Sequence, residues 1–113
     1  MASILLLSPH HSLARALASA MTIAGHDVLA VDHPKSAHGE TGRRRFDLAL
    51  LDVALTPLAE QVRTLTKRVV LFSTGAQSVS DHDVKSAGAL AFVSDLGPRT
   101  VLDSVTLHLN VRV

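Results

Sequence analysis

Residues 46–52 read Phe-Asp-Leu-Ala-Leu-Leu-Asp, a short apolar run that ends in a carboxylate. Every position from Leu48 to Leu51 is apolar, without alternation of apolar and polar residues. An uninterrupted run of this length is typical of a strand buried on both faces, as in a parallel sheet that is covered by helices. The segment therefore predicts a central strand over residues 47–51, followed by Asp52 at its carboxyl end.

Similar apolar runs recur along the chain, and segments with helical spacing separate them. Ser12, Ser80 and Pro98 are suitable helix starts, and Gly25 and Gly88 are suitable helix ends. Strict alternation of strand and helix predicts an α/β protein with one flavodoxin-like (βα)₅ doubly wound parallel sheet, in the order 2-1-3-4-5. We expect one domain over residues 1–113. Its strands are predicted at 3–7, 27–31, 47–51, 69–72 and 89–93. Its helices are predicted at 12–24, 58–67, 81–87 and 98–109, and residues 34–45 are predicted to form a polar loop or a poor helix.

Composition excludes several classes of protein. The chain has 113 residues, is 47% hydrophobic and has 19% charged residues, so it can bury a core. Only 3% of the residues are aromatic and the net charge is +1, which argues against direct nucleic-acid binding. The run Arg43–Arg45 is better explained as a solvated loop. Without cysteine, a secretory leader or a long apolar run, we expect a cytoplasmic protein that makes no membrane contact.

Polar residues follow the predicted strands at the edge where ligands of such folds bind. Ser8 and Pro9 follow the first strand, Asp52 the third, Ser73 the fourth and Asp95 the fifth. In this order and spacing the chain resembles the receiver domains of response regulators over nearly its whole length. The resemblance places Asp52 at the phospho-acceptor position, Ser73 where the family carries Ser or Thr, and Phe92 at the position of the switch aromatic residue.

The departures from the family pattern carry the functional prediction. Ser8 and Pro9 stand where the family has the acidic pair that helps to hold Mg²⁺, and Asp95 stands where it has a lysine. Mg²⁺ prefers carboxylate oxygens, and phosphoryl transfer depends on neutralising charge. We therefore expect Asp52 to be an inactive acceptor position, Mg²⁺ binding to be weak or absent, no other cofactor or metal, and no enzymatic activity.

The resulting interpretation is a pseudo-receiver of a two-component-type signalling or transcription regulator. By resemblance it would bind a protein partner or a second copy through the surface of the fourth helix, fifth strand and fifth helix, about residues 81–110, which includes Lys85, Arg99 and Asp103. The interpretation leaves open both a complete chain and an output domain after residue 113. Two alternatives stay open: a phosphorylatable receiver with Asp52 as acceptor, and a sensor of a small ligand or metal in the vacated crevice.

The same residues also have plain structural interpretations. Asp52 can end a strand and accept backbone hydrogen bonds, Ser73 can cap a turn, and Phe92 can pack in the core. His10 and His11, which would lie near Asp52, suggest a metal site. Because the side chains of adjacent residues rarely bind the same ion, we favour the interpretation that both are solvated loop histidines. The order Ser8, His10, Asp52 resembles a hydrolase triad, but the sequence has no nucleophile elbow.

Overall fold

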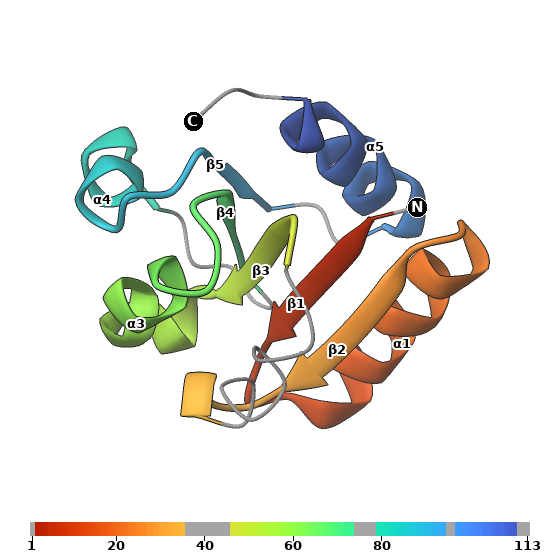
Figure 1. Ribbon diagram of the computed structural model, residues 1–113. Helices are drawn as coiled ribbons and strands as arrows, with labels where there is room; N and C mark the ends of the chain where they lie inside the picture. The colour runs from red at the N-terminus through yellow and green to blue at the C-terminus, as the bar shows by residue number, and fades with distance from the viewer. Residues whose placement is uncertain (1, 36–45, 74–78, 95–96, 111–113) are drawn as a thin grey trace.

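The strands form a single parallel sheet in the order β2-β1-β3-β4-β5. The computed structural model describes residues 2–35, 46–73, 79–94 and 97–110 (Figure 1). The strands are β1 (Ser3–Leu7), β2 (Asp27–Val31), β3 (Leu48–Asp52), β4 (Val69–Phe72) and β5 (Ala91–Val93). The predicted flavodoxin-like α/β fold and its strand order are therefore confirmed.

Helices connect the strands along the chain. They are α1 (His11–Ile23), the 3-10 helix η1 (Val53–Leu58), α3 (Ala59–Arg63), α4 (Asp81–Ser86) and α5 (Pro98–Leu109). None of the helices within the described residues has the length and apolar character that a membrane crossing requires.

Two predicted elements are shorter than expected. The predicted helix over 58–67 is only the five-residue α3, because its end tightens: the Thr64 N–H donates to the Gln61 carbonyl and the Leu65 N–H donates to the Val62 carbonyl. The predicted strand over 89–93 begins at Ala91, because the Ala89 N–H donates to the Val84 carbonyl and so belongs to the turn after α4. Most of the predicted polar loop, residues 36–45 with the run Arg43–Arg45, lies outside the described residues.

The helix ends agree with the sequence in most cases. Gly25 and Gly88 follow helices with φ values of +99° and +71°, a conformation that glycine adopts without a steric penalty. Ser80 caps α4, since its side chain accepts from the Asp83 N–H at 3.1 Å. The predicted start at Ser12 is wrong by one residue, because α1 begins at His11 and its N-cap, His10, makes no side-chain capping bond.

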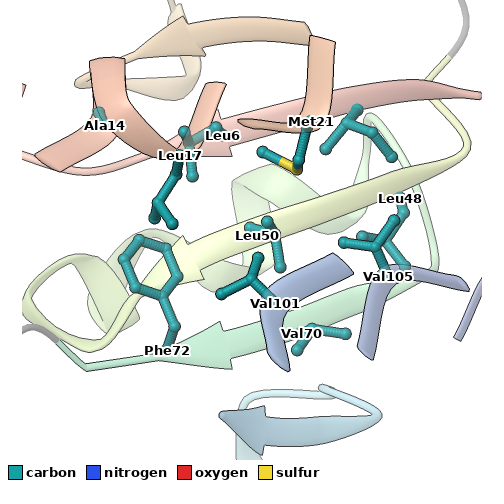
Figure 2. Packing of buried hydrophobic residues seen from close by; sticks show 11 residues of the cluster. Leu6, Ala14, Leu17, Met21, Leu48, Leu50, Val70, Phe72, Val101 and Val105 are labelled. Atoms are coloured by element: carbon teal, nitrogen blue, oxygen red, sulfur yellow. The ribbon is translucent and has the colours of Figure 1, made fainter. Parts of the chain in front are cut away.

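The sheet is covered on both faces, which explains why its strands are apolar runs. Successive strand residues point to opposite faces, so Ile4 and Leu6 of β1 join one cluster, while Leu5 and Leu7 join the other. The first cluster includes Leu17 of α1 and lies under α1 and α5 (Figure 2). The second lies under α3 and the end of α4. Because the strands are parallel, their carboxyl ends lie together at one edge of the sheet.

Candidate functional site

Three of the predicted site residues meet at the carboxyl ends of the central strands. Ser8 follows β1, Asp52 ends β3, and Ser73 follows β4. The register pairs Leu7 with Leu51, and Asp52 with Phe72, so the three side chains start from neighbouring strands. All three are buried: Ser8 and Asp52 are 1% exposed and Ser73 is 2% exposed. Parallel-strand topology thus brings together what the sequence separates by 44 and 21 residues (52 − 8 and 73 − 52).

Asp52 is held by donors on both carboxylate oxygens. The Ser8 hydroxyl donates to Asp52 Oδ2 at 2.9 Å, and the Ala54 backbone N–H donates to Oδ1 at 3.0 Å. Ser8 Oγ in turn accepts from the His10 N–H at 3.1 Å. Asp52 therefore ends β3 and accepts a backbone hydrogen bond. The chain of bonds links β1, the start of α1, β3 and η1.

The remaining predicted residues lie around this pair or outside the described part. Pro9 is exposed beside Ser8. The Ser73 N–H donates to the Val93 carbonyl of β5 at 3.4 Å. Phe92 in β5 is half-buried and packs against the cluster beneath α3 and α4, so its packing role is present. Asp95 lies outside the described residues.

The histidines do not join Asp52 as ligands in the described structure. His10 and His11 are both exposed, and His10 contacts Ser8 through its backbone N–H. Among residues 2–35, 46–73, 79–94 and 97–110, His, Asp and Glu side chains form no cluster of three that would hold a metal ion. The Ser8 hydroxyl points at a carboxylate oxygen instead of an imidazole, so the arrangement is not that of a hydrolase triad.

The donor set around Asp52 does not fit the magnesium site that the receiver fold implies. Mg²⁺ needs octahedral oxygen ligation with one or two carboxylates, together with waters and phosphate oxygens. Ser8 brings an uncharged hydroxyl and uses its proton on Asp52 Oδ2, while Pro9 brings no side-chain oxygen. Asp52 is buried, and both of its oxygens already accept hydrogen bonds. These residues do not assemble a carboxylate cluster for a divalent cation.

Three surface hollows lie on the described part of the chain, and Asp52 and Ser73 line none of them. A hollow of about 460 Å³ beside Ser8 lies between α1 and β2 and includes Arg15 and Asp32. One of about 590 Å³ lies on α4 and β5 and includes Phe92. Another, of about 840 Å³, lies between α3 and α4. Sequence reasoning missed its charged residues Glu60, Arg63 and Asp83, because no motif marks them.

Solved structures share this fold. A response regulator receiver domain (CheY-like) from Methanospirillum hungatei matches with a TM-score of 0.81 and 19% identity, over 97% of this chain and 94% of that chain. The amino-terminal domain of the nisin resistance regulator matches with a TM-score of 0.78 and 20% identity, over 97% and 99%. A response regulator from Thermotoga maritima, in complex with Mg²⁺ and BeF, matches with a TM-score of 0.77 and 16% identity, over 96% and 99%.

These likenesses define the fold as that of the receiver domains of two-component response regulators. At identities of 16% to 20% they carry the fold and not the site chemistry. No protein-family model matches the chain, and no curated protein matches it either. The functional conclusion therefore has to come from the residues at the strand ends.

Replacement of Ser8 by alanine tests the buried bond to Asp52. The change removes the donor to Oδ2 and the acceptor of the His10 N–H, and leaves a buried carboxylate oxygen without its partner. We expect Ser8→Ala to lower the free energy of unfolding by about 2 kcal/mol, measured by urea denaturation. Ser80→Ala, which removes an exposed helix cap, is the comparison and should cost about 1 kcal/mol or less. Equal losses would mean that the Ser8–Asp52 hydrogen bond stabilises the protein no more than the exposed helix cap at Ser80 does.

Proposed function

We propose that the chain is a pseudo-receiver, a signalling module with the receiver fold that acts through protein contacts without phosphorylation of Asp52. The observation that carries the proposal is the buried hydrogen bond from Ser8 to Asp52. In the family pattern the position of Ser8 belongs to an acidic residue that helps to bind Mg²⁺. Here a neutral hydroxyl satisfies the carboxylate, so the site is stable without a cation. Weak or absent Mg²⁺ binding follows from the same arrangement.

The proposed contact surface is formed by α4, β5 and α5. Its hollow of about 590 Å³ has apolar residues such as Val84, Leu90 and Phe92, with Lys85 next to them. An apolar centre with charges around it is typical of protein interfaces. On α5, Arg99 and Asp103 are exposed. Because this surface carries both signs of charge, it can pair with a second copy of itself in a symmetric dimer.

The dimer is tested by charge reversal on the proposed surface. Sedimentation velocity should show a monomer–dimer equilibrium that does not change when Mg²⁺ and acetyl phosphate are added. Lys85→Glu/Arg99→Glu should weaken the dimer about tenfold or more, since each substitution occurs twice in a symmetric interface. Arg15→Glu/Lys67→Glu makes the same change of charge at exposed positions elsewhere and should leave the equilibrium unchanged. A monomer at every concentration, or equal effects of the two pairs, would contradict the dimer.

The second candidate, a phosphorylatable receiver, is favoured by one observation. Asp52 ends the central strand β3 in a fold shared with a response regulator that was solved with Mg²⁺ and BeF. Against it stand the burial of Asp52, its two hydrogen bonds, and the residues at positions 8 and 9. Treatment with acetyl phosphate and Mg²⁺ separates the two candidates, because a covalent adduct on Asp52 forms only in the second.

A further inference from the structure

A groove with mixed chemistry lies between η1, α3 and α4, on the sheet face opposite to α1 and α5 (Figure 1). Its volume of about 840 Å³ exceeds that of the hollow on α4 and β5. We call it the α3–α4 groove, defined by Val53 and Pro57 of η1, Glu60 and Arg63 of α3, and Asp83 and Ala87 at α4. It adjoins the surface proposed for dimerisation, since opposite sides of α4 contribute to the two hollows.

The groove exists because the two helices beside it are short and their inward residues are small. α3 has five residues and α4 has six. Ala59 and Ala87, which are 5% and 8% exposed, stand where longer side chains would fill the space. Leu71 of β4, fully buried, contributes to the lining between them. These residues form a buried apolar floor, and the apolar lining side chains that keep exposed surface are Val53, Pro57 and Val79.

The rim of the groove is charged, and carboxylates dominate it. Glu60 on α3 and Asp83 on α4 are exposed lining residues. The Arg63 guanidinium lies against Gly88 in the turn after α4. The contact is so close that a Cβ on Gly88 would lie 2.5 Å from Arg63 Cζ. Arg63 thus packs over a glycine at one end of the groove. Two acidic side chains against one arginine make the rim complementary to a basic ligand.

We propose that the α3–α4 groove binds a basic amphipathic helix of a partner protein. The exposed parts of Val53, Pro57 and Val79 can contact the apolar face of such a helix. Lys or Arg beside that face can pair with Glu60 and Asp83. A drug-sized ligand would need more complete enclosure than this open, charged rim provides. The bound helix would contact η1, and the Ala54 N–H of η1 donates to Asp52. Binding could therefore change the environment of Asp52 without phosphorylation.

The test uses a synthetic helical peptide of Leu and Lys, with Leu at positions i, i+3, i+4 and i+7, labelled for fluorescence anisotropy. A peptide with Glu in place of Lys is the matched probe. We expect saturable binding of the Lys peptide only, with amide shifts in the NMR spectrum at Val53, Thr56 and Ala87. Glu60→Gln/Asp83→Asn should weaken binding about fivefold through the loss of two charge pairs.

The control variant, Asp81→Asn/Asp103→Asn, neutralises the same number of carboxylates outside the groove. Asp81 shares the first turn of α4 with Asp83, so the control also matches the effect on that helix. It should bind the Lys peptide as the unmodified protein does. The proposal is overturned if the peptide does not bind at millimolar concentration, if both variants lose affinity equally, or if the shifts centre on Val84 and Phe92.

Discussion

Incubation with acetyl phosphate and Mg²⁺ is expected to leave the intact mass of the protein unchanged, whereas the variant Ser8→Asp/Asp95→Lys should gain one phosphoryl group. The variant places a carboxylate beside Asp52 for Mg²⁺, and it puts a lysine at position 95, where the resemblance to receiver domains expects one to attract the phosphate. A like charge a few Å away costs on the order of 1–4 kcal/mol near a protein surface. Its replacement by a favourable charge should therefore speed the reaction by roughly a hundredfold or more.

Matched variants assign that gain to charge and to Asp52. Ser8→Asn/Asp95→Gln has side chains of similar size without the charges and should stay unmodified. Addition of Asp52→Asn to the restored variant should abolish the adduct. The restored variant should also show a melting temperature that rises with Mg²⁺, because a ligand that binds only the folded state stabilises it. An adduct on the unmodified protein that disappears with Asp52→Asn would establish the phosphorylatable receiver instead.

The fold was predictable because its main signal is local. Parallel strands covered on both faces must be apolar at every position, and 4–7, 48–51 and 69–72 are. The turns were predictable where one residue determines them, as with Gly25 and Gly88 at positive φ. The length of α3 was not predictable, since its end depends on the tightened turn in which the N–H groups of Thr64 and Leu65 donate to carbonyls three residues earlier.

The candidate site was predictable in position but not in its bonding. Topology alone brings Ser8, Asp52 and Ser73 to one edge. The sequence suggested that a lone carboxylate would stand there, yet it could not show that Ser8 donates to it or that both are buried. Such facts depend on side-chain rotamers and on the depth of the strand ends. The α3–α4 groove was also missed, because its shape results from the lengths of two helices and no sequence motif encodes it.

Truncation of Phe72 should cause a large loss of stability. This residue lies in the core and is also next to the strand edge that carries Asp52. Phe72 is 2% exposed, pairs in register with Asp52, and precedes Ser73. Figure 2 shows its ring directed toward Leu17 of α1, beside Leu50. Phe72→Ala should lower the free energy of unfolding by about 3–5 kcal/mol, which combines lost transfer free energy with the cavity left behind. Chemical denaturation with a circular dichroism readout measures it.

Phe92→Ala is the informative comparison, because Phe92 is half-buried on β5 and stands at the switch position of the family pattern. If Phe92 mainly packs at a surface, its truncation should cost about 1–2 kcal/mol, well below the cost at Phe72. In the pseudo-receiver the same truncation should weaken the dimer with or without acetyl phosphate, since Phe92 lines the hollow on α4 and β5. A loss of dimer only after acetyl phosphate treatment would show that Phe92 reports on Asp52, and would argue for a working receiver.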